Sequence, residues 1–273
     1  MCGGEGGMTP QPNSQARVLV VAGSDSGGGA GIQADIKTIT CLGGFAMTAL
    51  TAVTVQNTRG VSGVHMVPPD VVAAQMRAVI DDLGVDAVKI GMLGDVATIC
   101  AVADALVGVK VPVVLDPVMV ATSGDRLLAD VAVDAMVTWL LPLADVLTPN
   151  VPELLALVGG EVEDADGLRG AALRLLELGP RAVLAKGGHL AGDVLTDWLV
   201  WPGGSRGFSE RRIETRDTHG TGCTLASAVA VSLAQGLGLE DAVARGRAFV
   251  RQGLLMAPGL GQGAGPLGFY PMD

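Results

Sequence analysis

Short apolar runs alternate with longer amphipathic segments from residue 17 onward, and this alternation constrains the fold more than any other feature. Continuous runs of Val, Leu and Ile are typical of parallel strands covered on both faces, and helical spacing marks the segments between them. The pattern predicts βα units around a mainly parallel sheet. The strands expected in this sheet lie near residues 17–22, 46–55, 86–90, 112–115, 144–147 and 181–185.

Helices are expected on both faces of this sheet, near residues 30–42, 69–83, 95–107, 129–141, 165–178, 222–235 and 239–256. Residues 194–201 and 207–213 also have an extended pattern, and the sequence PGGS breaks them with a turn signal. They predict a late hairpin that forms an antiparallel edge of the sheet. The length of 273 residues suits one large α/β domain or two small ones.

The first 15 residues, MCGGEGGMTPQPNSQ, have neither the basic start nor the apolar core of a secretion signal. We expect them to form a disordered tail. The four cysteines show no C-x-x-C spacing, and one of them, Cys2, lies in this tail. This usage indicates a reducing cytoplasm, with no zinc site and no disulfide framework.

The charge balance limits the kinds of partner that the chain can have. Twenty-eight acidic residues outnumber 18 basic ones, which gives a net charge of −10, and no cluster of Lys or Arg stands out. Nucleic acid and anionic membranes are therefore excluded as expected partners. Asp134, Pro142 and Asp145 interrupt the most apolar segment, residues 131–147, so no run reaches the ~18 apolar residues that a bilayer requires.

Polar and glycine residues recur where each predicted strand ends. The carboxyl ends of parallel strands meet at one rim of an open α/β sheet, and ligands bind beyond that rim. We therefore predict a small-molecule site there. The segments concerned are GSDSGGGAG (23–31), QNTRG (56–60), GML (91–93), DPVM (116–119), TPNVPE (148–153) and KGGH (186–189).

The sequence DTHGTGCT, residues 217–224, concentrates the chemistry of an anion site in one turn. Gly220 and Gly222 permit a tight backbone, and the apolar run 225–233 predicts that the turn opens a helix. The first amides of that helix could hold a phosphoryl group, and a thiol at Cys223 would have a lowered pKa. The alternative is an ordinary helix capped by a threonine, with Cys223 as a small buried residue.

The glycine loop that follows the first strand does not match the common phosphate motifs. It lacks the Lys-Ser/Thr of a Walker loop, and no acidic residue occurs between Asp35 and Asp70 to bind a ribose about 20 residues on. A nicotinamide dehydrogenase is therefore disfavoured. The loop could instead close over a flat ligand through backbone contacts, with Asp25 or Asp35 nearby.

Two acids and one lysine at neighbouring strand ends suggest phosphoryl transfer. Asp116 and Glu153 could hold Mg²⁺, and Lys186 could neutralise a nucleotide phosphate as a point charge. The alternatives are a turn residue for Asp116 and, for Glu153, a helix first-turn residue after the cap Asn150. Lys186 could equally be a solvated lysine at the end of a strand.

Together the motifs resemble the hydroxymethylpyrimidine/phosphomethylpyrimidine kinases of thiamine biosynthesis, within the ribokinase-like superfamily. The matching motifs, in the order and spacing of that family, are GSDSGGGAGIQADIKT, TALTAVTVQNTRGV, KIGML, LDPVM, TPNVPE, KGGH and DTHGTGCTLASA. The resemblance covers residues 17–270. It implies one ribokinase-like domain, a three-layer α/β sandwich, over residues 16–273.

This resemblance also implies an activity. ATP with Mg²⁺ would phosphorylate 4-amino-5-hydroxymethyl-2-methylpyrimidine and then its monophosphate, and a requirement for a monovalent cation stays open. A homodimer in the cytoplasm is expected. Pyridoxal kinase, on the same fold, is the nearest alternative because its substrate is also a flat heteroaromatic with a hydroxymethyl group. A sensor that has lost catalysis is a remote third interpretation.

Carried over by position, the resemblance assigns roles to individual residues. Gln56 would bind the aminopyrimidine edge, and short flaps such as residues 57–65 would close the site. Cys223 occupies the position where most of the superfamily has an aspartate base. The other assignments are the ring-lining or substrate-binding residues Gly23, Ala30, Asp35 and Met92, the anion-binding Gly220, Thr221 and Gly222, the ATP-binding Lys186, Asn150 and Thr218, and the metal-binding Asp116 and Glu153.

Overall fold

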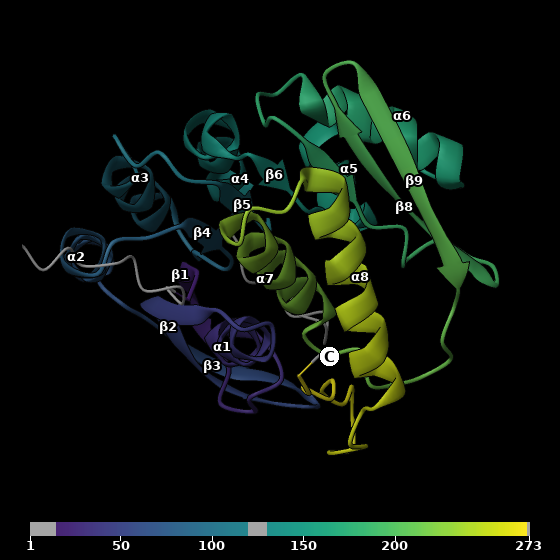
Figure 1. The fold of residues 1–273 in the computed structure, drawn as a ribbon, viewed down its shortest axis with the longest axis horizontal. Helices are drawn as coiled ribbons and strands as arrows, with labels where there is room; N and C mark the ends of the chain where they lie inside the picture. Colours follow the sequence, from purple (N-terminus) through teal and green to yellow (C-terminus); the bar gives the residue numbers. More distant parts are fainter. Residues whose placement is uncertain (1–14, 120–129, 272–273) are drawn as a thin grey trace, which may run out of the picture.

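One sheet of nine strands organises the structure, a computed structural model that describes residues 15–119 and 130–271 (Figure 1). The strand order is β3-β2-β1-β4-β5-β6-β7-β8-β9. The six strands from β2 to β7 in this order are parallel, and β3, β8 and β9 are antiparallel to their neighbours. Their bounds are β1 Arg17–Ser24, β2 Phe45–Asn57, β3 Gly60–Met66, β4 Ala87–Ile90, β5 Val113–Leu115, β6 Val146–Leu147, β7 Val183–Ala185, β8 Val194–Trp201 and β9 Gly204–Arg211.

Helices cover both faces of the sheet, which confirms the predicted three-layer sandwich. α1, α7 and α8 cover one face, and α2 to α6 cover the other (Figure 1). Their bounds are α1 Gly31–Cys41, α2 Pro69–Asp82, α3 Val96–Ala105, α4 Asp130–Trp139, α5 Val151–Val158, α6 Ala165–Leu176, α7 Thr221–Ala234 and α8 Leu239–Leu255, with a 3₁₀ turn at Leu141–Leu143.

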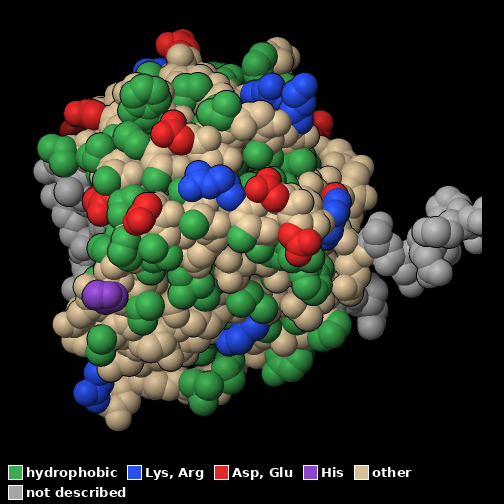
Figure 2. Space-filling model, turned by 90° about the vertical axis from the view of Figure 1, so that its left-hand side faces the viewer, with side chains coloured by type: hydrophobic (Ala, Val, Ile, Leu, Met, Phe, Trp, Pro, Cys, Tyr) green, Lys and Arg blue, Asp and Glu red, His purple; other side chains and the backbone are tan. Residues whose placement is uncertain are grey.

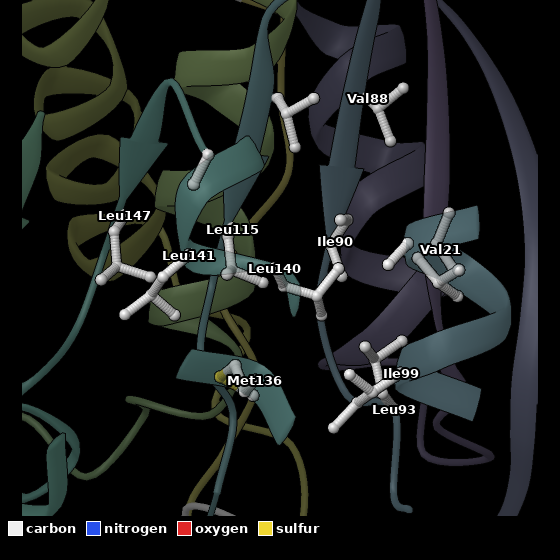
Figure 3. Close-up of a cluster of buried hydrophobic side chains, with 14 of the residues drawn as sticks. Val21, Val88, Ile90, Leu93, Ile99, Leu115, Met136, Leu140, Leu141 and Leu147 are labelled. Carbon is white, nitrogen blue, oxygen red and sulfur yellow. The ribbon is translucent and has the colours of Figure 1, made fainter. Parts of the chain in front are cut away.

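The apolar strands build two separate cores, one on each face. Side chains alternate across a strand, so Val21 and Ile90 face α2 to α6 while Val20 and Val114 face α1, α7 and α8. Figure 3 shows part of the first core, in which Ile90 and Leu115 lie close to Leu140 of the segment after α4. Burial on both faces explains why these strands have continuous apolar sequences.

The predicted late hairpin is confirmed as β8 and β9, and the opposite edge of the sheet has a strand that the sequence did not predict. Gly60–Met66, within the segment expected to act as a short flap, forms strand β3, antiparallel to β2. Helix α5 was also missing from the expected helices. Asn150 and Glu153 form a reciprocal capping box at its start, with Pro152 in the first turn, so local signals for this helix were present.

The surface that α2 and α3 form on the left of Figure 1 mixes side chains of every kind. Acidic and basic side chains lie singly, and hydrophobic ones are dispersed between them (Figure 2). Within residues 15–119 and 130–271, the structure contains no helix that is both long and apolar enough to cross a bilayer. The predicted tail, residues 1–15, lies outside the described residues except for Gln15.

Candidate active site

A cavity of about 1380 Å³ opens at the carboxyl ends of the parallel strands, the rim on which the sequence placed its candidate chemistry. The first turn of α7 and the segments after β1, β4, β5, β6 and β7 contribute to its wall. Of the predicted site residues, those that line the cavity are Gly23, Ala30, Gln56, Met92, Asp116, Asn150, Glu153, Lys186, Thr218, Gly220, Thr221, Gly222 and Cys223.

Asp35 is the predicted site residue that does not line this cavity. Its carboxylate is fully buried in α1, where both oxygens lie 2.9 Å from Lys89 Nζ and Oδ1 accepts a hydrogen bond from Ser227 in α7 at 2.7 Å. Asp35 therefore joins α1, β4 and α7 below the cavity floor. Sequence reasoning missed Lys89, whose only signal was one charged residue inside an apolar strand.

The glycine loop after β1 is organised around the Asp25 carboxylate. Asp25 accepts hydrogen bonds from the amides of Gly27, Gly29 and Ala30, at 2.7 to 3.0 Å, and its Oδ2 lies 2.9 Å from His219 Nε2. Burial alone would raise the pKa of Asp25, but the bonds from His219 and the amides outweigh it and lower that pKa. The loop is thereby fixed against the turn that precedes α7.

Gln56 lies near the end of β2 and lines the cavity, as Gly23 and Met92 do. Ser26 of the glycine loop holds the Gln56 backbone, because its hydroxyl donates to Gln56 O at 2.8 Å and accepts from Gln56 N at 2.9 Å. The Gln56 side-chain oxygen lies 3.1 Å from the Thr54 hydroxyl. The glycine loop and β2 thus hold Gln56 in place, and its side-chain amide lines the cavity.

The turn before α7 forms the centre of the cavity, as the sequence predicted. Gly220 precedes the helix with φ of 86°, and a side chain there would overlap the carbonyl oxygen of Gly29. A methyl group on Gly222 would lie 3.2 Å from Lys186 Nζ and 3.4 Å from Asp116 Oδ2. Both glycines therefore let backbone amides at the positive end of α7 approach a ligand closely.

Asp116 and Lys186 form a part-exposed ion pair beside this turn, with Nζ 3.0 Å from Asp116 Oδ1 and 4.0 Å from Glu153 Oε2. The hydroxyl of Thr148 also donates to Asp116, at 3.0 Å. Glu153 caps α5 through the Asn150 amide at 2.8 Å, so it has the helix-capping role while facing the cavity. Burial raises the pKa of Glu153 to about 7, Lys186 opposes this rise, and Asp116 adds to it.

The prediction of a lowered pKa at Cys223 is wrong. Although the residue lies in the first turn of α7 and lines the cavity, burial raises the pKa of its thiol to about 11. Lys89 lowers this pKa, but the nearby carboxylates Asp35 and Asp116 raise it. The thiol consequently keeps its proton at neutral pH, in contrast to a reactive cysteine at a helix N-terminus.

Two histidines that the sequence placed beside glycine loops also lie at this cavity. His219 is buried and pairs with Asp25, which agrees with its expected supporting position, and burial lowers the pKa of His189. The adjacent Asp217 has a buried side-chain oxygen, Oδ1, with no hydrogen-bond partner among the described residues. The described part of the chain contains no group of three His, Cys, Asp or Glu side chains arranged to hold a metal ion.

Solved structures with the same architecture are kinases. The ADP complex of Bacillus subtilis pyridoxal kinase superposes with a TM-score of 0.87 at 34% identity, and the two chains are covered to 94% and 98% respectively. The phosphomethylpyrimidine kinase of Clostridium difficile gives a TM-score of 0.78 at 36% identity, with coverage of 87% of this chain and 98% of that one. The fold and the cavity together define a phosphotransferase with a ribokinase-like fold.

Sequence comparison identifies the family within this class. The phosphomethylpyrimidine kinase family model matches residues 25–268, and the chain belongs to that family. The hydroxymethylpyrimidine/phosphomethylpyrimidine kinase of Streptomyces coelicolor is 49% identical, over 94% of this chain and 95% of its own length. The thiamine biosynthesis bifunctional protein ThiED of Geobacter sulfurreducens is also 49% identical over 94% of this chain, which spans 52% of that protein.

Proposed function

We propose that this kinase transfers the γ-phosphoryl group of ATP to the hydroxymethyl group of 4-amino-5-hydroxymethyl-2-methylpyrimidine and then to the resulting monophosphate, in thiamine diphosphate biosynthesis. The observation that carries the proposal is one cavity in which the amide of Gln56, the helix turn at Gly220–Cys223 and Lys186 converge. The naming of relatives at 49% identity as kinases of these two substrates supports it.

In this proposal the two ends of the cavity bind different substrates. Gln56 pairs with the aminopyrimidine edge, because a carboxamide both donates and accepts hydrogen bonds, while Gly23, Ala30 and Met92 line the ring. ATP lies toward Asn150, Lys186 and Thr218. The pyrimidine hydroxyl oxygen forms the new bond to the γ-phosphorus and releases its proton to solvent water as the bond to the ADP oxygen breaks, and the amides of Gly220, Thr221 and Gly222 stabilise the negative charge of the transferring group.

Cations complete the proposed site. The carboxylates of Asp116 and Glu153 fit Mg²⁺, whose ligands are oxygens, either directly or through water. The buried Oδ1 of Asp217 accepts no hydrogen bond from the described residues and lies 3.9 Å from Arg216 Nε, and we propose it as a ligand for a monovalent cation. Mg²⁺ held by Asp116 and Glu153 would offset phosphate charge on ATP during transfer. Isothermal titration of Asp116→Asn and Asp217→Asn with each salt tests the two assignments without turnover.

Cys223 is proposed as a catalytic residue that contacts the reacting hydroxymethyl group, with a role limited by its protonation. Because burial raises the pKa of the thiol to about 11, proton abstraction by a thiolate is unfavourable at neutral pH. Cys223→Ala should then reduce kcat by less than the roughly 10²- to 10⁴-fold typical of losing a general base. A loss within that range would restore Cys223 as the base.

Product analysis tests the activity. Purified protein with Mg-ATP should convert the hydroxymethylpyrimidine to its monophosphate and then its diphosphate, as followed by mass spectrometry. Monophosphate alone, even when monophosphate is supplied, would refute the second transfer. Gln56→Ala should weaken pyrimidine binding by about 1–3 kcal/mol without a matching change for ATP, because it leaves ligand groups unpaired. An unchanged dissociation constant in calorimetry would remove Gln56 from the site.

Pyridoxal phosphorylation is the alternative activity, supported by the likeness to pyridoxal kinases. The Staphylococcus aureus pyridoxal kinase in complex with AMP-PCP and pyridoxal is 32% identical, with a TM-score of 0.85 over 93% of both chains. The ratio of kcat/KM for the pyrimidine to that for pyridoxal decides between the two. A ratio below one would make pyridoxal the preferred substrate.

The assembly and the location in the cell are proposed from the same resemblance. We propose one kinase domain over residues 16–273 that forms a homodimer in the cytoplasm. The exposed side chains of Val53 and Val55, which lie on one face of β2, support a self-association surface, since apolar patches often mark interfaces. Sedimentation equilibrium of wild type and of Val55→Glu would test it: an unaltered oligomer in the variant argues against this edge.

A further inference from the structure

The glycine-rich segment 258–268, which follows α8, contacts two parts of the active site that lie far from it in the sequence. One is the tip of the β2–β3 hairpin at Thr58, and the other is the turn before α7. In Figure 1 the yellow C-terminal segment lies beside the end of this hairpin. The segment, called the C-terminal loop below, thus bridges the β2–β3 hairpin, which carries Gln56, and the turn before α7.

The contact with the hairpin depends on one hydroxyl group. Thr58 Oγ1 accepts hydrogen bonds from the amides of Gln262, at 3.2 Å, and Gly263, at 3.3 Å. The backbones also approach closely, because a methyl group on Gly263 would overlap the carbonyl oxygen of Thr58. A residue with a side chain at position 263 would therefore separate the loop from the hairpin.

The contact with the anion-binding turn lies a few residues further along the same loop. The amide of His219 donates to the carbonyl oxygen of Gly265 at 3.0 Å, and His219 is paired with Pro266 in a parallel bridge. Gly265 also lies against Asp217, where any side chain would overlap the carboxylate. The loop is therefore fixed at its Gly265 end by buried groups, and it can serve as a support for the hairpin.

Gln56 is held from one side by the glycine loop, through the paired bonds of its backbone with Ser26. Thr58, two residues further on, is held from the other side by the C-terminal loop. The pairing of β2 with β3 is irregular between Val55 and Gln56, so the ladder gives this point less support than a regular hairpin would.

We propose that Thr58 is a positioning residue that holds the tip of the β2–β3 hairpin against the C-terminal loop and so keeps the Gln56 amide directed at the pyrimidine. The inference rests on the proposed function for its choice of ligand. Thr58 does not line the cavity itself, but it follows Gln56 by two residues, and Gln56 lines the cavity that Lys186 and Asn150 also line. Loss of the Thr58 hydroxyl weakens pyrimidine binding and leaves ATP binding unchanged.

The test compares Thr58→Val, which keeps the shape and removes the acceptor, with Thr58→Ser, which keeps the hydroxyl. Steady-state kinetics of Thr58→Val should show a KM for the pyrimidine raised roughly 5- to 30-fold, as expected for losing one or two hydrogen bonds, with KM for ATP within twofold. Thr58→Ser should restore the wild-type KM. Ser62→Ala is the matched control, because Ser62 donates to Val55 O at 3.1 Å within the same hairpin and does not reach the C-terminal loop.

Hydrogen exchange separates this inference from the proposed function. Thr58→Val and Gly263→Ala should both increase amide exchange at residues 54–60 and 260–264, whatever substrate the enzyme uses, and Ser62→Ala should leave exchange at residues 260–264 unchanged. Unchanged exchange overturns the inference, and so does an equal rise in KM for ATP or a failure of Thr58→Ser to rescue. If wild type does not phosphorylate the pyrimidine, the proposed function fails. The exchange result still decides whether Thr58 holds the hairpin against the C-terminal loop.

Discussion

Two lysine–aspartate ion pairs beneath and beside the cavity differ in their access to ligands. Lys89 contacts both oxygens of Asp35 at 2.9 Å, and both side chains are 0% exposed. Lys186 contacts one oxygen of Asp116 at 3.0 Å, and its side chain is 14% exposed at the cavity wall. Both lysines line the cavity, but the first pair has no exposed side-chain surface and is called the closed pair below, whereas the second, whose lysine is partly exposed there, is called the open pair.

The difference shows how one pair of residue types can have two uses. The charges of the closed pair are neutralised between α1 and β4, and Ser227 extends the pair to α7. The open pair shares its lysine with Glu153 and lies beside Gly222, where no side chain covers it. The exposure of the lysine, not the identity of the pair, therefore distinguishes a pair that is fully buried from one that a ligand in the cavity could reach.

Removing the closed lysine should have the largest effect. Lys89→Met leaves the Asp35 carboxylate buried without its partner, so the free energy of unfolding should fall by about 3–5 kcal/mol. Urea unfolding measures it. The double variant Lys89→Met/Asp35→Asn should recover much of the loss, because the unpaired charge is gone and Ser227 can still bond the amide. A double variant as unstable as Lys89→Met would show that packing, rather than charge, explains the loss.

Removing the open lysine should mainly affect turnover. Lys186→Met should lower kcat roughly 10²- to 10³-fold, as for other groups that stabilise transition-state charge. Its effect on unfolding should be smaller than that of Lys89→Met, because Thr148 still donates to Asp116. Kinetics and urea unfolding on both lysine variants would break the comparison if Lys186→Met proved the less stable protein.

Glu153 gives the open pair a pH dependence. In EDTA, the folded carboxyl titrates at about 7 and the unfolded one at 4.5, so the folded protein holds an extra proton between these values. The stability associated with protonated Glu153 is complete below pH 4.5 and is lost as the pH rises through about 7. Glu153→Gln keeps a capping side chain and should abolish this decline. Parallel declines in both proteins between pH 5 and 8 would assign the titration elsewhere.

A third ion pair is the most exposed of the three, and its removal should have the smallest effect on the free energy of unfolding. Arg181 lies 2.9 Å from Asp145, but its side chain is 82% exposed. Arg181→Ala should change the free energy of unfolding by less than about 1 kcal/mol, and added salt should reduce even that. A larger loss, measured by thermal unfolding at low and high ionic strength, would mean that exposure does not order the three pairs.

The closed pair also marks the boundary of what the sequence could predict. Strand periodicity placed the rim correctly, because burial on both faces leaves a direct record in the apolar runs. Asp35 was assigned to the substrate because it follows the glycine loop, yet it lies one helical turn into α1 and faces the core. The partner that holds it there, Lys89, is 54 residues away, and no local pattern records such a contact.

Other differences have similar physical causes. The apolar pattern of 60–66 is too weak for a strand on its own, because β3 is an edge strand with several exposed side chains. The raised pKa of Cys223 depends on burial and on carboxylates from two other elements, which a helix-terminus motif does not report. All the predicted site residues except Asp35 therefore line the cavity, while the charge states within it required the fold.

The hydrogen bond between Asp25 and His219 can form only late in the synthesis of the chain. These residues are separated by 194 positions, and Gln262 bonds Thr58 across 204. At about 5–20 residues per second, a ribosome needs roughly 10–40 s to bring the second half of the first contact into existence after the first half. Throughout that interval the nascent chain holds a glycine loop without its histidine. The glycine loop and the turn before α7 are therefore joined only in the last stretch of synthesis.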